Sequence, residues 1–196
     1  LPLSLRRQRQ MCIRDRALAE AGVHTLVEKP LAASVESGQR VAEAFKSAGL
    51  IGAVGYVERC NPALLEMRKR LAEGQLGDVY QVVTRRQSPF PARISDVGVV
   101  KDLATHDVDL AAWVAGSEYK EIYAQTAHRS GREHEDMVVA SGSFKNGVLV
   151  NHLVNWLTPF KDRTTIVTGE HGALVADTAM GLSLIHISEP TRRRGI

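Results

Sequence analysis

Residues 21–57 read AGVHTLVEKPLAASVESGQRVAEAFKSAGLIGAVGYV, and this stretch decides the fold class of the chain. An apolar run at 23–27 ends abruptly in a polar turn, which predicts a short buried strand. Residues 34–48 then show helical spacing, with Ser34 able to cap the helix and a glycine able to end it. A second apolar run at 50–57 completes strand, helix and strand. The pattern is typical of a parallel βαβ unit in an open α/β sheet.

The pattern changes after a boundary near residues 57–60. A helix is predicted from Pro62, a strand at 79–87 and a helix at 100–114. Five strand-like runs follow at 119–127, 137–144, 147–156, 163–169 and 173–177. Asn146-Gly147 between two of these runs is a strong hairpin signal. The second part therefore reads as an α+β domain with a mainly antiparallel sheet.

The composition describes an ordinary globular protein, since 44% of the 196 residues are hydrophobic and 24% are charged. The net charge of +3 is too small to suggest a nucleic-acid partner. We find no apolar run near the ~20 residues that a membrane span needs, and no signal peptide. The two cysteines form no disulfide or zinc framework, which predicts a cytoplasmic setting.

Both ends of the sequence differ from the rest. LSLIHIS at 182–188 can be encoded by a DNA stretch whose reverse complement contains a coding sequence for MCIRD at 11–15. They resemble translated adaptor from sequencing-library preparation, although two unusual natural tails are the alternative. We therefore expect 1–16 and 182–196 to be artefact. The natural part would then comprise residues 17–57 and 58–181, each a partial domain truncated at its outer end.

The turn Glu28-Lys29-Pro30 is the first candidate for chemistry. Ligands of open α/β sheets bind beyond the carboxyl ends of the strands, where this turn is predicted to lie. A lysine at that edge can meet a cofactor or a substrate. The alternative is a solvated turn between a strand and a helix.

Asp102 and His106 are the second candidate, one turn apart on the predicted helix 100–114. A carboxylate in that position can orient the imidazole and raise its basicity. Asp109 and Trp113 extend the same stripe, although Trp113 could simply pack. A metal site would need a third ligand, which the spacing does not provide. The alternative is a histidine that is exposed or merely hydrogen-bonded.

Polar residues after the second strand form a third candidate site, and arginines further along could join them. Clustered arginines suit phosphate or carboxylate groups, whereas a single arginine is more often a surface charge. The segment HRSGREHED at 128–136 is interpreted as a solvated connection. The candidates for substrate binding are Tyr56, Arg59, Asn61, Arg86 and Arg93.

In order along the chain, AGVHTLVEKPLA, VGYVERCNPAL, LGDVYQVVTRR, DLATHDVDLAAWV and NWLTPFKDRTTIVTGEHGAL resemble the glucose-fructose oxidoreductase / inositol dehydrogenase / rhizopine-catabolism family (Gfo/Idh/MocA). The resemblance covers residues 17–181 and is nearest to members that act as UDP-N-acetylglucosamine 3-dehydrogenases. Cys60 stands where relatives often carry an aromatic residue. No GxGxxG phosphate loop occurs in the sequence, although the family's Rossmann half carries one.

The resemblance implies specific roles. Lys29 would contact the substrate hydroxyl and the nicotinamide region, while Glu28 and Pro30 would shape the cofactor side. His106 would exchange the hydroxyl proton, and Asp102 would hold it. The parent protein would be a homo-oligomeric oxidoreductase that uses NAD or NADP and acts on a sugar or sugar-nucleotide substrate.

Two alternatives stay open: a dehydrogenase of inositol or a free sugar, and a non-catalytic sugar-sensing protein on the same fold. Keeping a lysine, a base and its orienting carboxylate together favours an enzyme. The 196-residue chain itself is expected to be inactive without the phosphate loop.

Overall fold

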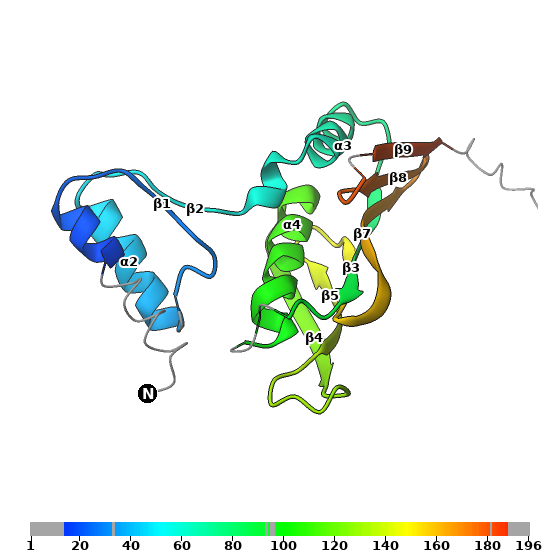
Figure 1. Ribbon diagram of the computed structural model, residues 1–196. Helices are drawn as coiled ribbons and strands as arrows, with labels where there is room; N and C mark the ends of the chain where they lie inside the picture. Colours follow the sequence, from blue (N-terminus) through cyan, green and yellow to red (C-terminus); the bar gives the residue numbers. More distant parts are fainter. Residues whose placement is uncertain (1–13, 33, 93, 95–96, 181, 188–196) are drawn as a thin grey trace, which may run out of the picture. The chain divides into compact units, whose positions relative to one another are not determined.

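The computed structural model describes residues 14–32, 34–92, 94, 97–180 and 182–187. The chain divides into two compact units between Tyr56 and Val57. This division falls one residue before the expected domain boundary. Each unit is described by itself, and Figure 1 shows the elements of both.

The first unit is a parallel βαβ unit, which confirms the predicted α/β class. Residues 14–20 are helical. They precede strand β1 (Thr25–Val27), helix α2 (Val35–Ser47) and strand β2 (Gly52–Val54), with β1 parallel to β2. The predicted cap is present, because the Ser34 side chain accepts a hydrogen bond from the backbone N–H of Ser37 at 3.3 Å.

The core of the first unit is small. Ala19, Val41 and Phe45 are its buried members. Helical spacing places Val35, Val41, Ala42 and Phe45 on one face of α2, but Val35 and Ala42 are exposed. These two side chains add no hydrophobic burial in this unit.

The second unit is a seven-stranded sheet with two main helices. Its helical elements are the 3-10 helix η1 (Val57–Cys60), α3 (Pro62–Ala72), the π-helix η2 (Val100–Ala104) and α4 (Thr105–Ala115). Its strands are β3 (Val79–Pro89), β4 (Tyr119–Ala127), β5 (Met137–Phe144), β6 (Leu149–Asn155), β7 (Leu157–Gly169), β8 (Gly172–Asp177) and β9 (Leu182–Ile187).

The strand order is β4-β5-β6-β3-β7-β8-β9, and every neighbouring pair is antiparallel except β3 and β6. The predicted hairpin is confirmed: β5 and β6 are joined by a turn in which Gly147 has a φ of +88°. Helices α3 and α4 (Figure 1) cover one face of the sheet. The main core lies between these helices and the sheet. It includes Leu64, Met67, Leu110 and Phe144, all at most 1% exposed.

The structure differs from the sequence predictions in three places. The expected helix at 100–114 begins as the π-helix η2 and becomes α-helical at Thr105. β7 starts at Leu157 rather than at 163, because it pairs with β3 along almost its whole length. The sheet also continues through β9, beyond the boundary expected at residue 181, because β9 pairs with β8.

Candidate functional site

Polar residues gather at the carboxyl edge of the parallel pair in the first unit. Glu28, Lys29 and Pro30 directly follow β1, and the peptide bond between Lys29 and Pro30 is cis. The two strand ends are joined there, because the backbone N–H of Gly55 donates to the carbonyl of Val27 at 2.7 Å. This is the edge at which open α/β sheets bind their ligands.

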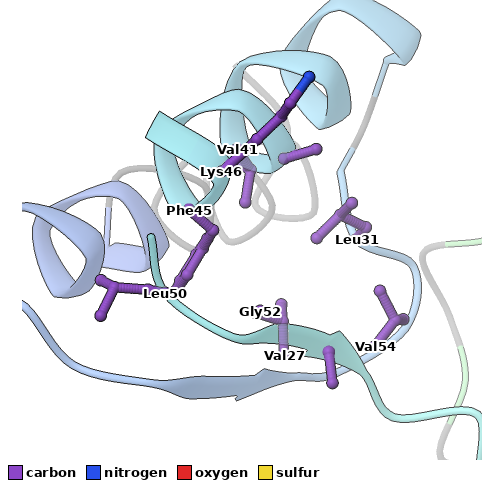
Figure 2. Close-up of a pocket in the computed structure, with 10 residues that line it drawn as sticks. Val27, Leu31, Val41, Phe45, Lys46, Leu50, Gly52 and Val54 are labelled. Carbon is purple, nitrogen blue, oxygen red and sulfur yellow. The ribbon is translucent and has the colours of Figure 1, made fainter. Parts of the chain in front are cut away.

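The first unit also contains a pocket of about 430 Å³ between α2 and the strands (Figure 2). Its lining is apolar apart from Lys46, and includes Leu31, Phe45 and Val54. Such a lining suits an apolar side chain better than a sugar or a phosphate. This apolar pocket is therefore distinct from the candidate ligand site at the polar edge that carries Lys29.

Asp102 and His106 lie at the junction between η2 and α4 in the second unit. Both side chains are half-buried. The backbone N–H of Asp102 donates to the carbonyl of Gly98 at 3.2 Å, which continues the helix backwards by one turn. π-Helical turns are rare and are frequent at functional sites. The irregular turn thus coincides with the residues that the sequence singled out.

Arg86 lies at the centre of a buried ionic cluster beside these residues. Its Nε donates to Asp107 Oδ2 at 2.8 Å, and its Nη1 donates to Glu58 Oε1 at 2.9 Å. The Arg86 side chain is 4% exposed. Burial raises the pKa of Asp107 to about 6, against the opposing effect of the Arg86 charge. The contacts of Arg86 in the second unit are thus internal, and a contact with substrate remains a prediction.

Other candidates for substrate binding also have internal partners. Arg59 forms a bidentate pair with Asp109, with N–O distances of 2.8 and 2.5 Å. Asn61 caps α3, since its Oδ1 accepts from the backbone N–H of Ala63 at 3.0 Å. Tyr56 is half-buried after β2. Arg93 lies outside the described residues.

Trp113 takes the packing role that the sequence left open. The Arg68 guanidinium lies 4.9 Å from the centre of its ring and also donates to its backbone carbonyl. Trp113 therefore connects α4 to α3. It does not extend the polar stripe of Asp102 and His106.

A chain of buried hydrogen bonds joins α4 to the sheet through His152, which is 1% exposed. His152 Nδ1 lies 2.7 Å from Thr84 Oγ1, and its Nε2 lies 2.9 Å from the Tyr119 hydroxyl. The Tyr119 hydroxyl donates to the carbonyl of Val108 at 3.2 Å, so it accepts from Nε2–H. Burial lowers the pKa of His152 to about 4, which keeps the ring neutral.

Arg163 is a candidate that the sequence prediction missed. The register of β3 and β7 places it directly opposite Arg86. Its side chain is 35% exposed and its Nη1 lies 4.0 Å from Glu58 Oε1. Burial and the Arg86 charge lower the pKa of Arg163, whereas the charges of Glu58, Asp107 and Asp102 act in the opposite direction. A half-exposed arginine that lies within electrostatic reach of Asp102 suits an anionic group.

The segment 128–136 is more than the solvated connection expected from its composition. Asp136 is fully buried, and its carboxylate accepts from the backbone N–H groups of Arg129 and Ser130. Glu135 bonds to the start of the η2 helix. Composition alone could not reveal these contacts, because they depend on a fold that brings distant residues together.

Within the described part of the chain, no helix is long and apolar enough to cross a membrane. No group of three or more His, Cys, Asp or Glu side chains in the same ranges could hold a metal ion.

Comparison with known proteins identifies the family. Residues 64–175 match the family described as the GFO/IDH/MocA C-terminal domain. The chain belongs to the GFO/IDH/MocA family. Residues 14–56 match its companion, described as the oxidoreductase family, NAD-binding Rossmann fold. The Rossmann match lies on the first unit and the C-terminal match on the second.

Several curated proteins are similar to this chain. Inositol 2-dehydrogenase 2 of Saccharopolyspora erythraea is 33% identical over 140 residues, which cover 69% of this chain and 41% of that protein. UDP-N-acetylglucosamine 3-dehydrogenase of Acidithiobacillus ferrooxidans is 29% identical over 132 residues, with 67% and 41% covered. The chain therefore spans about two fifths of the length of these relatives.

A solved structure gives the same result at the level of the fold. The WlbA dehydrogenase from Bordetella pertussis, in complex with NADH and UDP-GlcNAcA, has a TM-score of 0.82 and 26% identity. The match covers 94% of this chain and 58% of that one. The GFO/IDH/MocA fold thus accounts for nearly all of the chain.

Proposed function

We propose that this chain is part of a dehydrogenase that transfers a hydride between a secondary alcohol of a sugar or sugar nucleotide and NAD or NADP. One observation carries the proposal: the NAD-binding match on the first unit contains Lys29, and the C-terminal match on the second contains Asp102 and His106. A lysine, a carboxylate and a histidine can together polarise an alcohol oxygen and accept its proton.

Each candidate residue takes one role in the proposed chemistry. Lys29 polarises the substrate oxygen from the carboxyl edge of β1. His106 accepts the hydroxyl proton as the carbon loses its hydride, and Asp102 holds the imidazole in the required orientation. A positioned base of this kind typically contributes ~10²–10⁴-fold to the rate. The reverse reaction uses the same groups with the proton moving back.

The residues present fit the nicotinamide end of the cofactor. Glu28, Lys29 and Pro30 follow β1, and its end is bonded to the backbone of Gly55, which follows β2. These residues would hold the cofactor near the reacting carbon. The cofactor, when bound, supplies the acceptor for the hydride. The sequence contains no GxGxxG, so the fit applies to the nicotinamide end alone.

A sugar nucleotide is the substrate that the second unit favours. Arg163 adds a half-exposed positive charge near Asp102, and phosphate groups pair well with arginine. UDP-N-acetylglucosamine 3-dehydrogenase is among the relatives, which agrees with this choice. Arg59, Asn61, Arg86, Arg93 and Tyr56 stay proposed contributors to substrate binding.

An inositol or free sugar is the second candidate substrate. The observation in its favour is the relative Inositol 2-dehydrogenase 2, which shares 33% identity with this chain. An uncharged polyol would not need the charge of Arg163. The sugar-nucleotide and polyol candidates therefore predict that the same enzyme turns over different substrates.

A substrate panel tests the proposal in the full-length protein. Reduction of NAD or NADP is followed by absorbance with UDP-N-acetylglucosamine, free N-acetylglucosamine and myo-inositol. We expect turnover with the sugar nucleotide and little with the two uncharged compounds. Equal turnover of myo-inositol would reject the sugar-nucleotide version, and no turnover of any alcohol would reject the dehydrogenase.

Two finer points complete the proposal for the parent protein, of which this chain would be a fragment. We place it in the cytoplasm, because its two cysteines form no disulfide framework. We also propose a homo-oligomer. Size-exclusion chromatography with light scattering tests the second point, and a monomer at micromolar concentration would contradict it.

A further inference from the structure

Glu135 caps the helix that carries Asp102 and His106. The backbone N–H of Val99 donates to the carbonyl of Glu135 at 3.0 Å. The backbone N–H of Val100 donates to Glu135 Oε1 at 3.1 Å. One residue thus satisfies two consecutive donors at the start of the helix, from a position 35 residues away in the sequence.

These donors would otherwise have no partner within the helix. The first N–H groups of any helix lack an intrahelical acceptor and need a cap. The residue that precedes η2 is Val99, and its side chain forms no capping bond. The cap is therefore supplied by the segment 128–136, which connects β4 to β5.

The capping segment is itself held firmly in place. Asp136 is 0% exposed, and its Oδ2 accepts from the Ser130 hydroxyl at 2.6 Å. Its backbone N–H donates to Ala127, and its carbonyl accepts from the backbone N–H of Trp156. These bonds connect the segment to the end of β4 and to Trp156, which lies between β6 and β7, so the backbone next to Glu135 is fixed at both sides of the sheet connection.

Gly98 makes the close approach possible. A Cβ atom added at Gly98 would overlap the Glu135 carboxylate. The carbonyl of Gly98 accepts from the backbone N–H of Asp102. Gly98 therefore lies between the cap and the first of the two catalytic candidates, and any side chain there would displace the carboxylate.

From this geometry we propose that Glu135 is a positioning residue, which fixes the start of the η2 helix and thereby the orientation of Asp102 and His106. The role rests on the proposed function of those two residues. Misplacing a reacting group by about 1 Å can cost ~10²-fold in rate. A cap that sets the first turn of this helix can therefore act on turnover without touching the substrate.

Three variants of the full-length protein test the role. Glu135→Ala removes the side-chain acceptor, and we expect kcat to fall by about tenfold or more while the KM for the cofactor stays unchanged. Glu135→Gln keeps an oxygen at Oε1, and we expect kcat within about twofold of the parent. Glu133→Ala changes an exposed glutamate in the same segment and serves as the control.

Gly98→Ala gives an independent test, because it pushes the Glu135 carboxylate away from Val100. We expect it to reproduce the loss of kcat seen in Glu135→Ala. The double variant should be no worse than Glu135→Ala alone, since the group that the new methyl displaces is already absent. Additive losses would overturn the proposal, as would a kcat for Glu135→Ala that equals the control.

Hydrogen exchange separates a failed cap from a failed function. We expect the amides of Val100 and Asp102 to exchange about fivefold faster in Glu135→Ala than in Glu133→Ala. This measurement needs no substrate. Unchanged exchange overturns the cap itself, whereas faster exchange in a protein whose turnover survives His106→Ala overturns the proposed function on which the role rests. Equal kcat losses in Glu135→Gln and Glu135→Ala would also overturn the positioning role.

Discussion

Arg86 and Asp107 form a salt bridge in the interior of the second unit, with Nε 2.8 Å from Oδ2 and both side chains at most 4% exposed. Asp107 directly follows His106, and Arg86 also binds Glu58 in η1. The pair therefore joins the helix of the candidate site to strand β3 and to η1. Removing Arg86 would leave the carboxylates of Asp107 and Glu58 buried without their cation.

We predict that Arg86→Met lowers the free energy of unfolding by about 3–5 kcal/mol, since an uncompensated buried charge is costly. Arg85→Met is the matched control. Arg85 is the next residue on β3, and its partial exposure makes its pair with Asp162 worth about 0–1 kcal/mol. Urea unfolding of both variants measures the difference. Equal destabilisation would show that the buried cluster contributes no special stability.

The buried His152 predicts an acid-sensitive fold. Its pKa is about 4 in the folded state and about 6.5 in the unfolded chain, so the unfolded state binds the proton first. Stability is full above pH 6.5 and is lost as the pH falls toward 4. At pH 4.5 the loss from this residue is about 2–3 kcal/mol.

Unfolding at pH 7.5 and 4.5 checks the role of His152. The decrease in the free energy of unfolding from pH 7.5 to pH 4.5 should shrink in His152→Gln. It should persist in the control His171→Gln, because the side chain of His171 is exposed. If His152→Gln keeps the full pH dependence, another group causes it.

Variants of Asn61 distinguish a helix-capping role of this residue from a role in substrate binding. We predict that Asn61→Ala destabilises the protein by about 1 kcal/mol, because α3 loses the acceptor for the N–H of Ala63. Asn61→Asp should keep most of that stability, since aspartate caps equally well. Thermal unfolding compares the two. A loss in Asn61→Asp as large as in Asn61→Ala would contradict the capping role, while a raised KM with normal stability would support a contact with substrate.

Arg163 tests the choice of substrate. We predict that Arg163→Gln raises the KM for a sugar nucleotide by about tenfold or more, because a bond between charged groups is worth about 1.5–3 kcal/mol. Lys161→Gln is the control, two residues away on β7 and exposed. Steady-state kinetics give both values. An unchanged KM in Arg163→Gln would remove this residue from substrate binding.

Local signals explain what the sequence could predict. The βαβ unit follows from short apolar runs, the Ser34 cap and helical spacing, all within one segment. The hairpin at Gly147 is indicated by the adjacent residues Asn146 and Gly147. The pairing of Asp102 with His106 is indicated by their spacing of four residues, which is one helical turn. Each of these features can be recognised without knowing the rest of the fold.

Long-range contacts explain what the sequence could not predict. The burial of Arg86 depends on Glu58 and Asp107, 28 and 21 residues away. Arg163 becomes a candidate only through the register of β3 with β7. The cap by Glu135 spans 35 residues and accompanies a π-turn that helical periodicity cannot reveal. Composition suggested solvated or surface charges at these positions, because it does not show which distant residues contact each other in the fold.

In the proposed mechanism, His106 exchanges the proton in a nicotinamide-dependent oxidation. Single-turnover kinetics of His106→Ala in the full-length protein, with cofactor binding measured by titration, report on this step. His128→Ala, an exposed histidine on the segment after β4, is the control. We expect a rate lower by ~10²–10⁴-fold with unchanged cofactor affinity. A His106→Ala rate equal to that of the control would contradict it.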